Sequence, residues 1–204
     1  MSAISTVLWD VGGVLLTNGW DHVGRAAVVA HFGLDRGEFE RRHAIVNDPW
    51  ERGVISAAEY MSEAVFHQPR SFTPAEFLEQ MKAESQVLPD GGLGVLVRMA
   101  ESSGLQLAIL NNEARELNDY RLQQFNLTPF FECFLSSCYV GLRKPDPKIY
   151  QRGLDILQRS AGEVVFIDDR AENVAPAAAL GMHGIQFRNP AQLCSELALL
   201  GINI

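Results

Sequence analysis

The chain has 204 residues, of which 47% are hydrophobic and 21% charged, and its formal net charge is -8 at pH 7. These values are typical of a globular protein that is long enough for one domain with a substantial insertion. The negative charge argues against general binding to nucleic acid, which needs a basic surface. A short N-terminal apolar run that Trp9 and Asp10 interrupt predicts neither a signal peptide nor a membrane span.

The three cysteines, Cys133, Cys138 and Cys194, are odd in number and lack metal-ligand spacing. We expect them to be small core residues in a reducing, cytoplasmic compartment. The composition leaves both a monomer and a homodimer open.

The stretch Ile4–Leu15 (ISTVLWDVGGVL) predicts a buried strand that ends abruptly at an acid. The run is rich in β-forming residues, and Asp10 stands at its C-terminal tip. Gly12 and Gly13 follow as a tight turn, with a phosphate cradle as their alternative role.

Residues 17–87 carry no strand pattern and instead show apolar residues at helical spacing, beginning at Trp20. Three helix starts are indicated by N-capping pairs: Asp35 with Glu38, Ser56 with Glu59, and Thr73 with Glu76. These signals predict about four helices. Because they lie between the first and second strands, they could cover the carboxyl edge of a sheet as a small helical cap.

Residues 88–204 alternate between predicted helices and strands. The helices are Asp90–Ala100, capped by Asp90, then Arg115–Phe125, one opened by Asp146 and Pro147, Asn173–Leu180, and one capped by Asn189. The strands are Leu105–Leu110, Glu132–Ser136, Val164–Ile167 and Gly184–Phe187. This order predicts an α/β fold with a doubly wound parallel sheet in residues 1–16 and 88–204.

Polar residues follow three of the predicted strands: Asp10 the first, Asn111 and Asn112 the second, and Asp168 and Asp169 the fourth. In an open parallel sheet, ligands bind outside the carboxyl ends of the strands, where the strand order reverses. We therefore expect these side chains to meet in one crevice and to form a hydrolytic site.

Three of these residues, Asp10, Asp168 and Asp169, carry carboxylates that would repel one another unless a cation lies among them. Magnesium suits an all-oxygen site and needs few protein ligands. Two carboxylates and a backbone carbonyl, for which Gly12 is the candidate, would be enough. We therefore expect Mg²⁺ as the cofactor.

Lys144 stands at the start of a predicted helix, where its ammonium could balance both a carboxylate nucleophile and a phosphoryl oxygen. An amide from Asn111 or Asn112 would add to this neutralisation. Asp10 would then be free to attack phosphorus in a small phosphorylated metabolite, forming an aspartyl-phosphate that water cleaves.

Four motifs, in the family's order, resemble those of the haloacid dehalogenase-like hydrolase superfamily: DVGGVL, LAILNN, RKPDPKIY and VVFIDDRAEN. Most members of this superfamily are magnesium-dependent phosphatases. The resemblance implies a Rossmann-like core with a helical cap inserted after the first motif.

The resemblance also implies roles for individual residues. Asp10 would be the nucleophile and Lys144 the lysine of the third motif. Asp10, the Gly12 carbonyl and Asp169 would hold magnesium. Asp168 would be a further ligand or a carboxylate that supports the ligands, and Asn173 would orient the metal site.

The sequence departs from the family pattern at Gly12, where phosphatases usually carry an acid that protonates the leaving group and then activates water. Losing that acid would cost about 10²–10⁴ in rate. The glycine resembles the branch of sugar-1-phosphate phosphatases and the amino-terminal domain of soluble epoxide hydrolase, so it does not by itself imply an inactive protein. Because the acid is missing, we expect substrates with good leaving groups, such as anomeric sugar phosphates or acyl phosphates, to turn over best. Glu113 could supply the acid, although a solvated glutamate at a helix start is favoured. Asn111 replaces the usual serine or threonine.

Two alternatives stay open. In a 2-haloacid dehalogenase, Asp10 would attack carbon without a metal, and the metal-suited pair of Asp168 and Asp169 speaks against this. In a non-catalytic member, the cleft would bind a phosphometabolite without turnover, because Gly12 lacks the acid.

Substrate specificity is expected to lie in the helical insertion. Its candidate contact residues are polar or aromatic: Trp20, Asp21, His22, Trp50, Glu51 and Arg52. Packing between helices is favoured for the tryptophans and His22. The remaining histidines show no ligand spacing.

Overall fold

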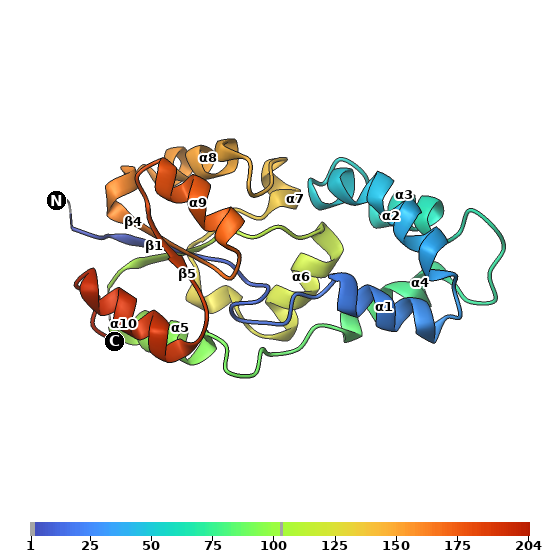
Figure 1. The fold of residues 1–204 in the computed structure, drawn as a ribbon, viewed down its shortest axis with the longest axis horizontal. Helices are drawn as coiled ribbons and strands as arrows, with labels where there is room; N and C mark the ends of the chain where they lie inside the picture. Colours follow the sequence, from blue (N-terminus) through green and yellow to red (C-terminus); the bar gives the residue numbers. More distant parts are fainter. Residues whose placement is uncertain (1–2, 103) are drawn as a thin grey trace.

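The computed structural model describes residues 3–102 and 104–204, and a five-stranded sheet forms its centre (Figure 1). The strands are β1 (Thr6–Trp9), β2 (Gln106–Ile109), β3 (Cys133–Phe134), β4 (Val164–Asp168) and β5 (His183–Gln186). Their order is β3-β2-β1-β4-β5 and every pair is parallel. The strand order reverses at β1, which confirms the predicted doubly wound α/β fold.

Successive strand residues point to opposite faces of the sheet, and each face packs against helices in its own hydrophobic cluster. Leu8 and Phe166 point to the face covered by α8 (Pro147–Leu157) and α9 (Ala171–Ala179). Val7 and Trp9 point to the opposite face, which is covered by α5 (Leu93–Ser102), α6 (Arg115–Gln124) and α10 (Pro190–Leu199). Short helical turns complete this part: η1 (Thr128–Phe130), α7 (Ser137–Val140) and η2 (Ala161–Glu163).

Four helices form the other end of the molecule (Figure 1): α1 (His22–His31), α2 (Arg36–Glu51), α3 (Ala57–Ala64) and α4 (Pro74–Ala83). They begin where the sequence predicts, because the side chains of Asp35, Ser56 and Thr73 each accept a hydrogen bond from the backbone N–H three residues on. These helices bury their own aromatic core around Trp50, which stacks on Tyr60.

The predicted helix after Pro89 is wrong at its start. Asp90 has a φ of 56°, in the left-handed region, rather than the extended conformation of a capping residue, and α5 begins only at Leu93. Among the residues described, no helix combines the length and apolarity needed to cross a bilayer.

Candidate active site

The first and fourth strands bring an acidic cluster to the carboxyl edge of the sheet. Trp9 pairs with Ile167, so the two strands end at the same level. Asp10 follows Trp9, and Asp168 and Asp169 follow Ile167. Oxygen atoms of these three carboxylates lie within 4.8 Å of one another. The structure therefore brings the three predicted acids together.

Lys144 reaches this cluster from the segment before α8. Its Nζ lies 3.0 Å from Asp10 Oδ1 and 2.6 Å from Asp168 Oδ2, and the residue is only 2% exposed. Asn112 holds the lysine backbone on both sides: its Nδ2 donates to the Lys144 carbonyl and its Oδ1 accepts from the Lys144 N–H, each at 2.8 Å. Asn112 thus fixes where the ammonium enters the site.

Burial governs the protonation of the cluster. It raises the pKa of Asp10 to about 7, against the opposing effect of Lys144 and with a further rise from Asp168. Burial also raises the pKa of Asp169, again with a contribution from Asp168. For Lys144, burial works to lower the pKa, but the attraction of Asp10 and Asp168 outweighs it and the pKa is raised. One ammonium does not balance three carboxylates.

The two adjacent acids differ in how their oxygens are used. Asp168 is fully buried and accepts from Lys144, from the backbone N–H of Arg170 and, at both oxygens, from the side chain of Asn173. Asp169 has a buried Oδ1 with no hydrogen-bond partner. A free carboxylate oxygen beside Asp10, in an all-oxygen set with excess negative charge, fits a divalent cation.

Gly13 leaves room for that carboxylate. Its φ is +71°, and a Cβ built on it would lie 2.3 Å from Asp169 Oδ2. Both the backbone conformation and the contact demand glycine here. Gly13 therefore supports the turn that the sequence predicts after Asp10.

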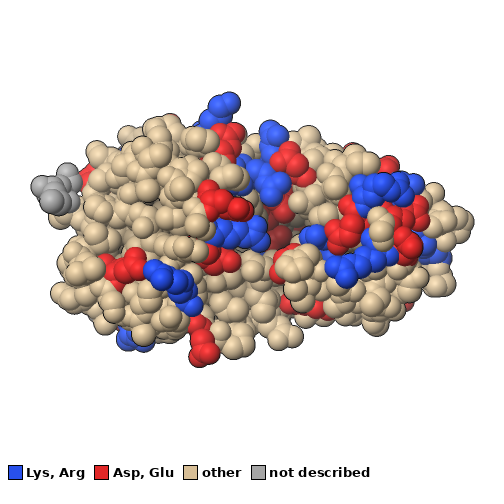
Figure 2. Space-filling view, in the orientation of Figure 1, with Lys and Arg blue, Asp and Glu red and all other residues tan. Residues whose placement is uncertain are grey.

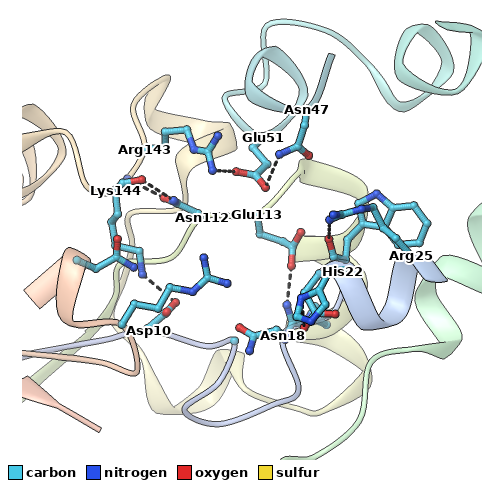
Figure 3. Close-up of a pocket in the computed structure, with 16 residues that line it drawn as sticks. Asp10, Asn18, His22, Arg25, Asn47, Glu51, Asn112, Glu113, Arg143 and Lys144 are labelled. Carbon is cyan, nitrogen blue, oxygen red and sulfur yellow. Dashed lines mark hydrogen bonds and ion pairs between the residues drawn. The ribbon is translucent and has the colours of Figure 1, made fainter. Parts of the chain in front are cut away.

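A polar cavity of about 300 Å³ opens above the cluster (Figure 3). In Figure 2, acidic and basic side chains gather across the middle of the molecule, between the part with the sheet and the part with α1–α4. Charged, amide and aromatic side chains line the cavity together with Gly12: Asp10, Asn18, Trp20, Asp21, His22, Arg25, Asn47, Glu51, Asn112, Glu113, Arg121, Arg143, Lys144, Arg170 and Asn173.

Three of the predicted contact residues, Asn111, Trp50 and Arg52, do not line this cavity. Asn111 donates its amide to Asn118, so it is not brought to the phosphate position expected for it. Trp50 packs on Tyr60. Arg52 donates to the carbonyl of Gly141 on the outside.

The structure contradicts the expectation favoured for Glu113 and pairs this residue with Arg121, which was not among the predicted site residues. Glu113 is not a solvated helix-start residue: it is 5% exposed, lines the cavity, and burial raises its pKa although Arg121 opposes the rise. Arg121 Nη1 donates to Glu113 Oε2 at 2.5 Å. Sequence reasoning missed Arg121, although it shares the buried face of α6 with Leu117 and Leu122, a spacing that signals an inward arginine.

The chain is similar to several characterised proteins. It is 29% identical to flavin mononucleotide hydrolase 1 of Arabidopsis thaliana over 178 residues, 87% of this chain and 71% of that protein. It is 26% identical to the sesquiterpene phosphatase astK of Aspergillus oryzae over 207 residues, 98% of this chain and 97% of that protein.

The fold is also similar to that of a solved structure. The HAD family enzyme BT-2542 from Bacteroides thetaiotaomicron, in its magnesium complex, superposes with a TM-score of 0.78 at 21% identity, covering 92% of this chain and 95% of that one. The family model for the haloacid dehalogenase-like hydrolase matches residues 4–181. This chain therefore belongs to the haloacid dehalogenase-like hydrolase family.

Proposed function

We propose that this hydrolase is a phosphatase that acts on a small phosphorylated metabolite with Mg²⁺, through an aspartyl-phosphate on Asp10. The observation that carries the proposal is the buried contact between Asp10 and Lys144, next to an Asp169 oxygen without a partner. Two relatives whose names describe a phosphatase and a mononucleotide hydrolase support it.

Asp10, Asp169 and the Gly12 carbonyl would hold the metal, with Asp168 as a further or supporting carboxylate. When bound, Mg²⁺ would neutralise charge on the phosphoryl oxygens and orient the phosphoryl group. The magnesium complex of BT-2542, a protein with the same fold, supports this choice of ion.

The side chains of this site suit attack by a carboxylate on phosphorus. Asp10 would form the new bond, and Lys144 would neutralise the phosphoryl oxygens once they arrive. Asn112 keeps the lysine in place through its two backbone hydrogen bonds. The cavity of about 300 Å³ is small and lined by charged and amide groups, which favours a compact hydrophilic substrate.

We further propose residues 17–87 as a cap on a core formed by residues 1–16 and 88–204. The two connections lie side by side, because the Thr17 N–H donates to the Gln86 carbonyl at 2.8 Å and the Gln86 N–H donates to Thr17 Oγ1 at 3.0 Å. The cap would then contact the substrate through residues that line the cavity: Trp20, His22 and Glu51.

The test is phosphate release from a panel of phosphomonoesters, measured with Mg²⁺ and with a chelator. The wild type should turn over only with Mg²⁺, and substrates with good leaving groups should react fastest. Asp10→Asn should lower kcat by at least about 10³-fold, as loss of a nucleophile does. Asp35→Asn, which keeps a capping side chain at the start of α2, is the control and should keep kcat.

Other outcomes would point elsewhere. Chloride release from a 2-haloacid without a metal, abolished in Asp10→Asn, would support a dehalogenase. Saturable binding of phosphate esters with no turnover across the panel would support a non-catalytic member. Equal turnover by Asp10→Asn and wild type would rule out the aspartyl-phosphate.

A further inference from the structure

The space beside Gly12 is filled from another part of the chain. A Cβ built on Gly12 would lie 3.2 Å from Asn18 Oδ1 and 3.9 Å from Nη1 of Arg121. Gly12 has no left-handed backbone conformation, so its lack of a side chain is not required by the turn. A guanidinium on α6 therefore stands next to the position that lacks a carboxylate.

Arg121 is held rigidly in that position. It is 3% exposed, Nη1 donates to Glu113 Oε2 and Nη2 donates to the Thr17 carbonyl, each at 2.5 Å. A Cβ on Gly19, whose φ is +66°, would lie 2.9 Å from Nη1. The loop that leaves β1 thus wraps closely around the guanidinium.

The arginine retains unused hydrogen-bonding capacity. A guanidinium has five N–H donors, and Nε of Arg121 is buried without a partner. Arg121 and its partner Glu113 both line the cavity that contains Asp10 (Figure 3 labels Glu113 and Asp10). A buried ion pair adds little stability over apolar residues of similar size. The position of the Arg121–Glu113 pair in the lining of the cavity therefore favours a role in binding a ligand.

We infer that Arg121 contacts the leaving-group oxygen of the substrate and stabilises the negative charge that develops there. Glu113 is a positioning residue, because it acts by holding the guanidinium. The inference rests on the proposed function. It explains how the alcohol can leave although Gly12 has no carboxyl group to protonate it.

The step balances without a proton donor from the protein. Asp10 forms a bond to phosphorus, and the bond from phosphorus to the ester oxygen breaks with its electron pair on that oxygen. The alkoxide, paired with the Arg121 cation, takes a proton from water and leaves hydroxide. Hydroxide then attacks the aspartyl-phosphate, releasing hydrogen phosphate and the Asp10 carboxylate.

The experiment compares leaving groups rather than a single substrate. The quantity measured is kcat/KM with Mg²⁺ for p-nitrophenyl phosphate, phenyl phosphate and an alkyl phosphate. Because an alkoxide needs far more stabilisation than nitrophenolate, Arg121→Met should lose about 10²–10³-fold on the alkyl ester, the usual cost of one donor to a developing oxyanion. The loss on p-nitrophenyl phosphate should stay below about tenfold.

Three further measurements test whether the change in rate comes from the lost guanidinium and not from a disturbed structure. The double variant Arg121→Met with Glu113→Gln avoids an unpaired buried carboxylate and should show the same dependence on the leaving group. Guanidinium ion at non-denaturing concentration should restore alkyl phosphate hydrolysis by Arg121→Ala. Arg42→Met removes the ion pair between Arg42 on α2 and Glu63 on α3, away from the cavity, and should leave all three rates unchanged.

The remaining outcomes overturn the inference. If kcat/KM falls by the same factor on all three esters, the Arg121–Glu113 pair has only a structural role. Abolished alkyl hydrolysis in Glu113→Gln, with a lost limb in the pH profile, would make Glu113 the proton donor instead. Turnover of no ester by the wild type would overturn the proposed function and this inference with it, whereas parallel losses leave the proposed function intact.

Discussion

Gly13 shows how closely the backbone approaches the acidic cluster. A Cβ there would lie 2.3 Å from Asp169 Oδ2, so Gly13→Ala should push the carboxylate aside. We expect Mg²⁺ affinity to fall at least about tenfold, as it does when groups that orient metal ligands are lost. The measurement is the Mg²⁺ concentration that gives half-maximal phosphate release.

A second glycine offers a matched control. Gly33 has a φ of +62° and no atom within 4 Å of its virtual Cβ, so Gly33→Ala carries the same backbone strain without the contact. Both variants should lose stability, and only Gly13→Ala should lose metal affinity. If the two respond alike to Mg²⁺, Asp169 is not a ligand.

The raised pKa of the buried Asp10 carboxyl makes the stability of the folded chain depend on pH. Its pKa is about 7 in the folded chain, above the ordinary value of 3.8, so the folded state holds this proton to higher pH than the unfolded chain does. Stability contributed by the group is therefore lost as pH rises from about 4 to about 7. In metal-free urea titrations, Asp10→Asn should be more stable than the wild type at pH 8, with the difference shrinking toward pH 4. An unchanged gap at both pH values would contradict this.

At the scale of elements, His43 couples α2 to α3. Its ring is buried and Nδ1 lies 2.7 Å from the Tyr60 hydroxyl, which also accepts from Trp20. Burial lowers the pKa of His43 to about 4, with Arg25 adding to the effect.

The pKa of His43 predicts acid sensitivity of these helices. Since the unfolded chain binds a proton below about pH 6.5 and the folded chain only near pH 4, stability is lost as pH falls through this range, by up to about 3 kcal/mol. The wild type should show this slope in chemical denaturation, and His43→Leu should flatten it. A slope that persists in His43→Leu would assign it to other groups.

The elements most visible in the sequence were those with local chemical signals. Ser56 and Thr73 form capping boxes with glutamates three residues on, and each begins a helix as predicted. Asp10 and Asp168 stand at the tips of strands because apolar runs end there. In contrast, Asp90 looks like a cap, yet its left-handed φ places it in a turn, which the sequence Pro89-Asp90-Gly91 also signals.

For residues whose role depends on distant partners, the sequence pattern gives at most the buried side of a helix. The spacing of Arg121 with Leu117 and Leu122 signals an inward side chain. Only Glu113 and the Thr17 carbonyl, from two other segments, make it a buried and paired cation. Asn111 follows a strand as predicted, but its amide meets Asn118 on α6 instead of the cavity. Side-chain direction after a strand is settled by tertiary neighbours, which spacing alone does not report.

At the scale of the whole molecule, Arg143 joins the two ends across the cavity through ion pairs with Asp48 and Glu51 on α2. Arg143 Nη2 lies 2.7 Å from Glu51 Oε2, linking the residue before Lys144 to the end of α2 (Figure 3). Both side chains are partly exposed, so the pair is worth about 1 kcal/mol at most.

Loosening this connection should affect substrate binding more than folding. Glu51→Gln should raise KM about two- to fivefold and make KM less sensitive to salt, with the unfolding temperature little changed. Steady-state kinetics at low and high ionic strength, beside thermal unfolding, measure both effects. A KM that keeps the wild-type value and salt response would show that the pair does not hold the cavity in shape.

The three central strands end in register, with Trp9 opposite both Ile109 and Ile167. Because successive strand residues face opposite sides, one residue added to or removed from β1 would turn Asp10 away from its partners. The turns before α2 and before α4 lie outside the sheet and have no such register to keep. Insertions and deletions can therefore accumulate in these turns during evolution and alter the side of the cavity formed by α1–α4. At the ends of the strands, one side chain can be exchanged for another, but a change in chain length is not tolerated.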